Sequence, residues 1–562
     1  MDAEAKKKMN DNMLVQGSIL AIASIIVRVI GLIYRIPLTR IIGDVAMGYY
    51  STAFEFYNLA LLLSSYSLPL AVSKLVSARQ AEGRYKDAGK VFTVGLSFGF
   101  VVGTLASLAV YFCADIYAKF NHSPLVAIPL RVLAPTIFVF SVMGVVRGFF
   151  QGYNNMVPTA VSQVVEQIVN AAVSVGMATY MMKKYEGTPE QSAYGAAGGT
   201  WGTFLGACAA AVFLLCVLIY KARSFRANNH QTDTDSIMES RESFGMILKV
   251  LLLTVLPVVI SQTVYQLSGT IDVSIFHRNL AGKGIDELTR NTWWGIYSAK
   301  YKLLTNVPVA VASAMGTAIV PSLVFALKKG NMDKVRDKVS SAIKFNMIVA
   351  FPCAFGFMSL GRPIMELLYN DSSELTENMM TIGGIAVVFF ALSTVSNGIL
   401  QGINHMFIPV LHSLIALGIH CVTLVLLLRF TEINAMALVF CNVLFAVIVS
   451  ILNAISIRRY LSYKQEYRTT FLIPLISAVL MGLFCTQCYF ALHWFLNLFM
   501  KSHPAVNNAI SVLVSILLGA FVYFANLIVL GGVSRKEIED MPKGKLLAGV
   551  LTKLHLLKRN ME

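Results

Sequence analysis

Long uninterrupted apolar runs are the feature of this sequence that most restricts its fold. A membrane-spanning helix needs about 20 consecutive apolar residues, and 56% of the 562 residues are hydrophobic whereas only 14% are charged. A soluble protein carries about a quarter charged residues, and a transmembrane β-barrel shows short alternating runs instead of long continuous ones. We therefore expect an all-α integral membrane protein.

Fourteen apolar runs are long enough to be candidate spans. They cover residues 13–38, 46–72, 91–114, 125–150, 157–182, 195–220, 247–275, 296–323, 345–361, 379–402, 407–429, 434–457, 470–495 and 506–531. The first run is too long for the core of a signal peptide, so we expect it to remain as a span. The sequence therefore predicts 14 transmembrane helices.

The distribution of Lys and Arg predicts the orientation of these spans. With an even number of spans both termini lie on one side, and the segments on that side contain 30 of the 46 basic residues against 11 in the opposite loops. Basic loops mark the cytoplasmic side. We expect both termini in the cytoplasm, and basic loops beside anionic lipid explain the net charge of +16 without a nucleic-acid partner.

An internal repeat organises the first twelve spans. Phe150-Gln151-Gly152-Tyr153-Asn154-Asn155-Met156 is echoed by Leu400-Gln401-Gly402-Ile403-Asn404-His405-Met406, and Gly48-Tyr49-Tyr50-Ser51 is echoed by Gly295-Ile296-Tyr297-Ser298. A spacing of six spans preserves orientation, so the repeat is parallel. We expect two six-helix lobes around a central cavity, residues 1–235 and 236–465, followed by spans 13 and 14 with a basic cytoplasmic tail, residues 466–562.

Ionisable residues inside spans are candidates for function, because burying a charge in the membrane is costly. Arg28 and Arg35 lie seven residues apart in span 1, which places both on one helical face about 10 Å apart. Lys300 and Lys302 lie in span 8 about 200° apart, so at most one faces the same cavity as the arginines.

Three acidic residues complete the set. Glu55 lies in span 2, Glu166 in span 5 and Asp272 in span 7. The repeat offset of 247 residues aligns Glu55 with Lys302, which places opposite charges at equivalent positions. For Asp272 and Glu166 the alternatives are an ion-coupling site and a structural hydrogen-bonded carboxylate.

The functional interpretation of these residues is a net cationic, water-filled cavity between the lobes. Arginine binds phosphate oxygens with two hydrogen bonds and lysine binds them as a point charge. A substrate with a pyrophosphate or several acidic groups fits such a cavity, with Arg28, Arg35, Lys300, Lys302 and Glu55 as its contacts. The structural alternative is that Arg35 extends to the membrane interface and that Glu55 pairs with a lysine for packing alone.

No catalytic motif accompanies these charges. The sequence contains no phosphate-binding loop of nucleotide hydrolases, no zinc-protease helix and no nucleophile elbow. We expect a transporter that is not an enzyme, with no metal site and no cofactor except a coupling ion, Na⁺ or H⁺, if one participates.

Several motifs resemble one transporter family. Arg28-Val29-Ile30-Gly31, Arg35 and Thr39-Arg40-Ile41-Ile42-Gly43 are similar to the first span of MurJ-type lipid II flippases of the multidrug/oligosaccharidyl-lipid/polysaccharide exporter superfamily. The run from Pro308 to Leu323 resembles their eighth span. Gln151-Gly152 and the run from Pro158 to Gln167 resemble the branch described as polysaccharide biosynthesis or stage V sporulation protein B.

This resemblance implies alternating access between two lobes in a bacterial cytoplasmic membrane. The substrate would be lipid II, the undecaprenyl-pyrophosphate-linked peptidoglycan precursor, with its lipid tail in a groove of spans 13 and 14. The family's basic residues map onto Arg28, Arg35 and Lys300. The span 2 basic residues of some members are absent, because Glu55 stands in that helix.

Other functions remain open at the level of the sequence. They are a flippase for another lipid-linked glycan (a teichoic-acid, capsule or spore-cortex precursor), a cation-coupled multidrug exporter, and a non-transporting scaffold. The expected partners are the lipid-linked saccharide, membrane lipids and the cell-wall synthesis machinery, and the expected oligomeric state is a monomer. We expect the membrane potential to drive transport, because negative charge is favoured to leave a negative-inside cell.

Overall fold

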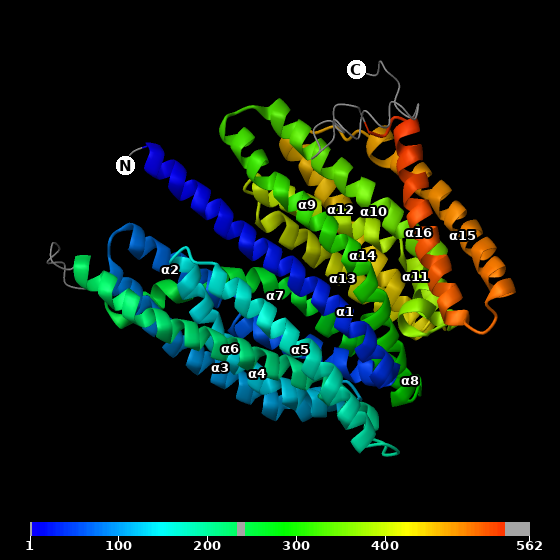
Figure 1. The fold of residues 1–562 in the computed structure, drawn as a ribbon, viewed down its shortest axis with the longest axis horizontal. Coiled ribbons are helices and arrows are strands. Elements are labelled where there is room, and N and C mark those ends of the chain that lie inside the picture. Colours follow the sequence, from blue (N-terminus) through cyan, green and yellow to red (C-terminus); the bar gives the residue numbers. More distant parts are fainter. Residues whose placement is uncertain (1–2, 233–241, 534–562) are drawn as a thin grey trace. The chain divides into compact units, whose positions relative to one another are not determined.

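The computed structural model describes residues 3–232 and 242–533, and its chain divides into two compact units. Unit 1 comprises Met1–Gly295 and unit 2 comprises Ile296–Glu562. Helices make up both units, as Figure 1 shows. The expected all-α class is therefore confirmed for the described residues.

Unit 1 contains eight α-helices and one short 3₁₀ turn. These are α1 (Ala3–Ser64), α2 (Leu68–Ala81), α3 (Tyr85–Phe120), η1 (Pro124–Val126), α4 (Ala127–Gly152), α5 (Val157–Lys184), α6 (Gln191–Thr232), α7 (Phe244–Gly282) and α8 (Glu287–Gly295).

Unit 2 contains eight α-helices and two π-helical turns. These are η2 (Ile296–Tyr301), α9 (Lys302–Lys328), α10 (Met332–Tyr369), α11 (Glu374–Gly383), α12 (Ala386–Gly402), α13 (Phe407–Phe430), α14 (Met436–Leu461), η3 (Arg468–Leu472), α15 (Ile473–Phe499) and α16 (Pro504–Val529). The two C-terminal helices pack against each other and against α10.

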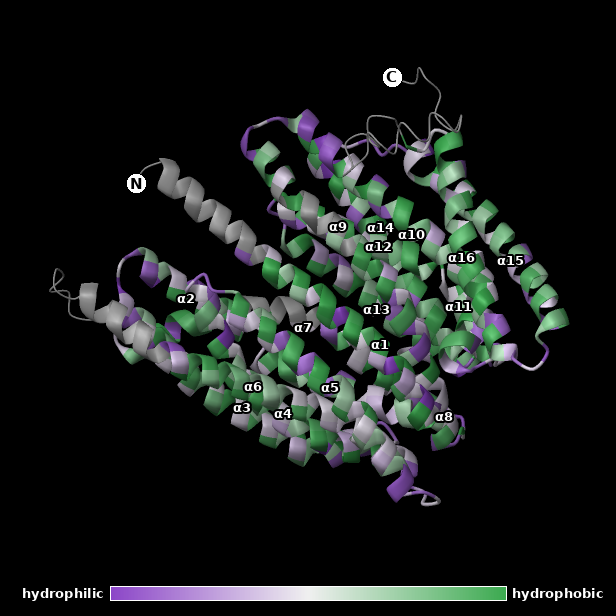
Figure 2. Ribbon diagram, viewed as in Figure 1, coloured by the Kyte–Doolittle hydropathy of each residue, from purple (hydrophilic) through white to green (hydrophobic). Residues whose placement is uncertain are grey.

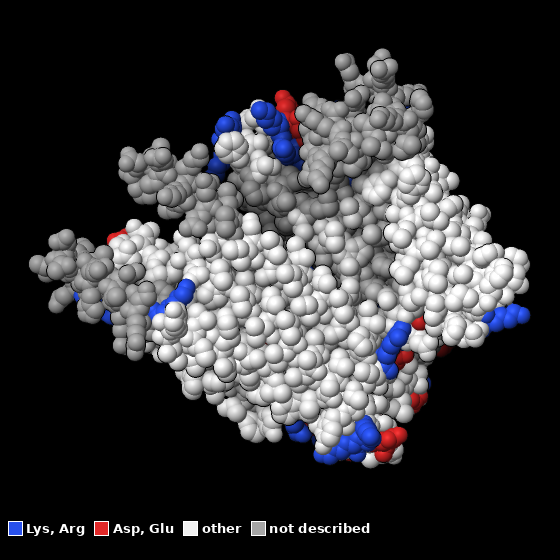
Figure 3. Space-filling view, viewed as in Figure 1, with Lys and Arg blue, Asp and Glu red and all other residues white. Residues whose placement is uncertain are grey.

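The helices carry the polarity that a membrane requires. Nine helices among the described residues are long and apolar enough to cross a membrane, or ten if the bent pair α11 and α12 forms one span. Apolar residues follow the lengths of the helices in Figure 2, and in Figure 3 the charged residues in view gather at helix ends, with uncharged surface between them on each unit. The chain is therefore a multi-pass membrane protein.

The fourteen predicted ranges fall on these helices in order. Helix α1 carries two of them, joined at Gly43, whose positive φ of 76° breaks the helical backbone. The ranges on α5 and α9 are not among these nine helices, and the described part of α7 contributes a shorter apolar helix, Phe244–Leu256. The total of 14 crossings stays a prediction.

Glycine stripes bring the helices of unit 1 into backbone contact. On α6, Gly198, Gly202 and Gly206 recur every four residues, and Cβ atoms added to them would lie 2.0–2.6 Å from atoms of α5. The same spacing recurs on α3 at Gly95, Gly99 and Gly103, which face α4, and on α4 at Gly144, Gly148 and Gly152, which face α2. Lipid tails provide no hydrophobic drive for helix association, so close packing of small residues replaces it.

The repeated tetrads meet each other directly. A Cβ on Gly48 would lie 2.1 Å from the carbonyl oxygen of Asn291, and a Cβ on Gly295 would lie 2.0 Å from that of Asp44. Each carbonyl belongs to the residue four positions before the other glycine. This reciprocal contact is what two repeats related by a two-fold axis produce, and it supports the duplication inferred from the sequence.

The compact units do not follow the predicted lobe boundary. Unit 1 extends to Gly295, whereas the predicted first lobe ends at residue 235, because α7 and α8 pack against α1. Contacts and duplication are different criteria for dividing a chain, so the boundaries at 235/236 and 465/466 stay predictions.

Replacing Gly48 with alanine should destabilise the fold. The added methyl meets a backbone carbonyl that no rotamer change can move, and overpacking of this kind costs about 1–3 kcal/mol. Gly418→Ala is the matched control, because no atom lies within 4 Å of a Cβ at that position on α13. We expect the thermal midpoint of the purified protein to fall for Gly48→Ala and to stay level or rise for Gly418→Ala. Equal midpoints would contradict the close contact.

Candidate functional site

The predicted site residues divide between the two units. Unit 1 holds Arg28, Arg35, Glu55, Glu166 and Asp272, and unit 2 holds Lys300 and Lys302. Within each unit the structure specifies the surroundings of these side chains, and the central cavity between the lobes stays a prediction.

The two arginines lie on the continuous part of α1 that precedes Gly43. The seven-residue spacing therefore keeps its predicted helical phase. Arg28 is exposed and Arg35 is half-buried. The backbone of Arg35 is further fixed, since Thr39 donates a hydrogen bond of 2.8 Å to its carbonyl oxygen.

Glu55 and Asp272 share the contact between α1 and α7. The carboxylate of Glu55 lies against Gly269, where an added Cβ would be 2.1 Å from its Oε2 atom. Thr270 donates a hydrogen bond to the carbonyl oxygen of Glu55, and Asp272 is buried two residues further along α7. The close approach at Gly269 is what gives the Glu55 carboxylate room beside α7.

Glu166 is half of a salt bridge inside unit 1. Its Oε2 atom lies 2.8 Å from Nη2 of Arg147, and the side chains are 21% and 10% exposed respectively. Nε of Arg147 also donates to the Ser162 hydroxyl, 3.0 Å away. The structural alternative for Glu166 thus has a specific partner.

Lys300 is buried in the π-helical turn η2 and paired with an aspartate. Its Nζ lies 2.6 Å from Oδ2 of Asp371, with side chains 4% and 12% exposed. Asp371 follows α10, outside the spans. Burial raises the pKa of its carboxyl, but the hydrogen bonds that it accepts, above all the one from Lys300, outweigh this effect and lower that pKa to about 2.

Lys302 lies one residue beyond this turn and is partly exposed, whereas Lys300 is 3% exposed. The different exposure agrees with the prediction that the two lysines lie on different faces. The π-helical turn between α8 and α9 is itself a feature often found at functional sites.

Sequence reasoning missed both partners of these charged residues. Asp371 is 71 residues from Lys300 along the chain, and Arg147 is not among the site residues that the sequence predicts. The signal for Asp371 is local. It accepts hydrogen bonds from the Ser373 amide and the Thr376 hydroxyl, a turn typical of aspartate before a helix.

Salt bridges and hydrogen bonds attach both ends of helix α7 to the rest of unit 1. Glu242, just before its start, forms salt bridges of 2.9 and 2.8 Å with Arg79 and Arg84 of the α2–α3 region. Beyond its other end, Arg290 donates to the carbonyl oxygens of His277 and His122, at 2.9 and 3.0 Å. These contacts explain why the first compact unit includes α7 and α8.

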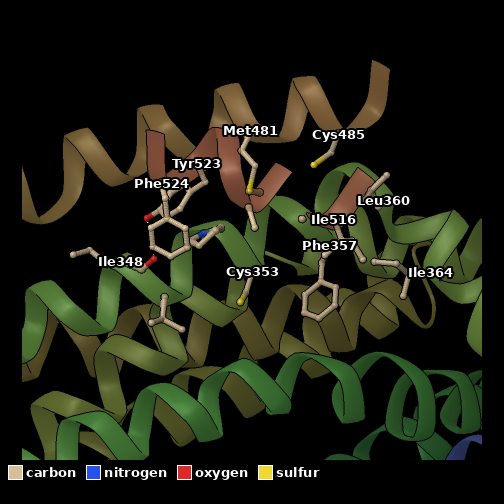
Figure 4. Close-up of a pocket in the computed structure, with 14 residues that line it drawn as sticks. Ile348, Cys353, Phe357, Leu360, Ile364, Met481, Cys485, Ile516, Tyr523 and Phe524 are labelled. Atoms are coloured by element: carbon tan, nitrogen blue, oxygen red, sulfur yellow. Dashed lines mark hydrogen bonds between the residues drawn. The ribbon is translucent and has the colours of Figure 1, made fainter. Parts of the chain in front are cut away.

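An apolar cavity of about 390 Å³ lies in unit 2 between α10, α15 and α16, as Figure 4 shows. Its lining includes Cys353 and Phe357 from α10, Met481 and Cys485 from α15, and Phe524 from α16. The Tyr523 hydroxyl is satisfied by the carbonyl oxygen of Ile348, 2.9 Å away. The cavity therefore suits a hydrocarbon chain.

Two family models match this chain. The model described as "Polysaccharide biosynthesis protein" matches residues 14–326, more than half of the chain, and the model described as "MatE" matches residues 302–426.

Individual proteins are similar over nearly the whole chain. The lipid II flippase MurJ of Bacillus subtilis (strain 168) is 26% identical over 521 residues, 90% of this chain and 93% of the relative. Stage V sporulation protein B of the same organism is 22% identical over 462 residues, 82% and 86% of the two chains. A solved structure of lipid II flippase MurJ in an inward closed conformation has a TM-score of 0.62 at 13% identity, covering 91% of this chain and 99% of that one.

Removing the carboxylate of Asp371 should destabilise the protein in a pH-dependent way. Asp371→Asn removes the carboxylate charge that pairs with the buried Lys300, and breaking a buried ion pair in this way costs about 3–5 kcal/mol. Because the folded pKa is depressed, the stabilisation is complete above the ordinary value near 3.8 and is lost as the pH falls through about 2. The gap in thermal midpoint between wild type and variant should therefore narrow below pH 4.

The matched control is Asp333→Asn. Asp333 also forms an ion pair, in this case with Arg336 at 3.1 Å, but its side chain is 91% exposed. An exposed pair contributes about 0–1 kcal/mol, so this variant should unfold near the wild-type midpoint. A similar loss in both variants would contradict the buried pair.

Proposed function

The chain belongs to the family of polysaccharide biosynthesis proteins, and from this premise we propose that it is a flippase that moves lipid II from the inner to the outer leaflet by alternating access. Like its relatives, the protein is a transporter and not an enzyme. The observation that carries the proposal is the similarity to lipid II flippase MurJ, which extends over 90% of this chain.

The length of that similarity favours a lipid-linked substrate over a drug. The MatE match ends at residue 426, before α15 and α16. The apolar cavity that these two helices form with α10 supports a role in holding the polyprenyl tail. Two helices outside the duplicated core are thus available for the part of the substrate that a drug lacks.

The basic residues support binding of the pyrophosphate head. Arg28 is exposed on α1, and its guanidinium can give phosphate oxygens two parallel hydrogen bonds. In the proposal, Arg28, Arg35, Lys300, Lys302 and Glu55 surround the head in the central cavity. Lys300 would exchange Asp371 for the phosphate in part of the cycle.

A flippase for another polyprenyl-pyrophosphate glycan is the second candidate. The similarity to stage V sporulation protein B over 82% of this chain favours a spore-cortex precursor within this class. Teichoic-acid and capsule precursors carry the same lipid and pyrophosphate, so the same cavity would serve them. A cation exporter is disfavoured, because basic residues dominate the predicted cavity.

The membrane potential is the proposed driving force, in a bacterial cytoplasmic membrane with both termini in the cytoplasm. The lipid head carries about two negative charges, and each net charge that crosses the membrane gains about 2.3 kcal/mol per 100 mV. A positively charged empty cavity is favoured to return inward. Asp272, buried on α7, is the proposed site if Na⁺ or H⁺ also participates.

Arg28→Ala should abolish flipping without loss of expression. Arg28→Lys should restore it only partly, because a point charge replaces a planar fork. The test is growth and lipid II flipping in a strain depleted of the native protein, with immunoblotting for protein level. Lys501→Ala, an exposed basic residue in the loop between α15 and α16, is the control and should complement fully. Normal complementation by Arg28→Ala would contradict the proposed role of Arg28 in binding the pyrophosphate head.

The substrate and the driving force are testable together. Depletion of the protein should cause lipid II to accumulate in the inner leaflet, and accumulation of a different lipid-linked glycan would redirect the proposal to that substrate. In liposomes that contain the purified protein, collapse of the membrane potential should slow flipping, and unchanged transport would refute potential-driven movement. Full activity of Asp272→Asn at all sodium concentrations and pH values would remove the ion site at Asp272.

A further inference from the structure

A buried polar network joins three helices of unit 2. His412 of α13 hydrogen-bonds through Nδ1 to Oδ1 of Asn453 on α14, 2.8 Å away. The amide nitrogen of Asn453 donates to Ser396 Oγ and Asn397 Oδ1 on α12, at 2.9 and 2.7 Å. An imidazole within a predicted span is costly to bury and marks a candidate functional group.

These contacts identify which ring nitrogen of His412 donates a hydrogen bond to Asn453. The amide nitrogen of Asn453 is committed to α12, so its oxygen faces the ring and accepts a hydrogen bond. Nδ1 must therefore carry the proton, and Nε2 is left as the basic atom. Its neighbour is the hydroxyl of Ser456, at the long distance of 3.4 Å. The ring thus keeps Nδ1–H on Asn453, and Nε2 is its weakly engaged nitrogen.

Further polar and charged residues lie between the network and one end of α13 and α14. The ring of His405, just before α13, stacks on Tyr460 with centroids 3.9 Å apart. Tyr460 lies one turn beyond Ser456 on α14, near the exposed Arg458 and Arg459. In the proposed orientation this end is cytoplasmic, so Nε2 points toward the cytoplasmic end of the helices.

The equivalent position in unit 1 is filled differently. The Gln-Gly motifs, Gln151 and Gln401, and the starts of α5 and α13 are each 250 residues apart. This offset aligns Arg147 with Asn397 and Ser162 with His412. In unit 1 the network is a fixed ion pair, Arg147 with Glu166. In unit 2 it contains an imidazole ring, amides and hydroxyls.

We propose that His412 is the proton-binding site that couples a proton gradient to transport, which leaves Asp272 as the candidate site for Na⁺. This inference rests on the proposed flippase function. A proton enters from the cytoplasmic end and binds Nε2, while the proton on Nδ1 stays on its bond to Asn453. Nε2–H then donates to the Ser456 oxygen. The ring gains one positive charge, and release of that proton restores the neutral state.

The groups around His412 determine how a positive charge on its ring affects the helices. The groups of α12 and α14 that hydrogen-bond within this network are uncharged: the side chains of Ser396, Asn397, Asn453 and Ser456 and the backbone carbonyl of Ser393. Other titratable or charged groups on or beside α13 and α14 include His405, His420, Arg458, Arg459 and Tyr460. His420 bonds to the backbone carbonyl of Cys441. A protonated ring therefore favours an arrangement of α12, α13 and α14 that solvates it, and this links proton binding to conformation.

The test uses the full-length protein in liposomes, with the potential clamped at zero by valinomycin and equal potassium. An imposed pH gradient should change the initial rate of lipid II flipping by the wild type, and His412→Gln should lose this response. Glutamine can still donate to Asn453 but cannot bind a proton, so a merely structural histidine would tolerate it. His420→Gln is the matched control, a buried histidine on the same helix, and should keep the response.

A second measurement reads proton binding directly. Nitrogen-15 spectra of histidine-labelled protein should show an Nδ1–H imidazole that becomes doubly protonated on acidification, that is missing in His412→Gln and that is retained in His420→Gln, since Nδ1 of His420 also bonds to a carbonyl oxygen. The wild-type titration decides the question even if that variant fails to fold. Flipping that is absent under every gradient and potential would overturn the proposed function. Flipping that responds to pH equally in His412→Gln, or that loses its response only in Asp272→Asn, would overturn the assignment to His412.

Discussion

Backbone contact between helices is the constraint on which this fold depends. In lipid the backbone must satisfy its own hydrogen bonds, so the elements are helices, and helices gain little by burying apolar side chains that lipid would accept equally well. The glycine stripes of α3, α4 and α6 solve this problem because they let neighbouring backbones approach. The same device brings Gly48 and Gly295 together and so joins the two copies of the repeat.

Charged residues in the helices follow from the same constraint. Arg147 with Glu166 and Lys300 with Asp371 are paired at 2.8 and 2.6 Å, which offsets the cost of removing each charge from water. The arrangement separates two classes among the basic residues. Lys300 already has a carboxylate partner, whereas Arg28 presents an exposed guanidinium. A phosphate that binds Lys300 must compete with Asp371, and one that binds Arg28 meets an exposed group.

The sequence predicted what depends on local pattern and missed what depends on distant contacts. Apolar runs placed the helices, and the repeated tetrads identified residues that the fold brings together. The partners of Lys300 and Glu166 could not be predicted, since no local pattern connects position 300 with 371 or ranks Arg147 above the other basic residues. The contact of α7 with unit 1 was also missed, because hydropathy describes how a helix meets lipid and not which helix it packs against.

Duplication gives the two halves the same helices, and sequence divergence then gives them different chemistry. The polar position between spans 4 and 5 holds an ion pair, Arg147 with Glu166. Its counterpart between spans 10 and 11 holds a histidine and amides. In the proposal, the network of unit 2 changes its charge when a proton binds to His412, and the ion pair of unit 1 takes no part in that change. A carrier whose lobes are alike in fold can in this way respond to a proton in one lobe alone, and the proton gradient then gives the proposed cycle its direction.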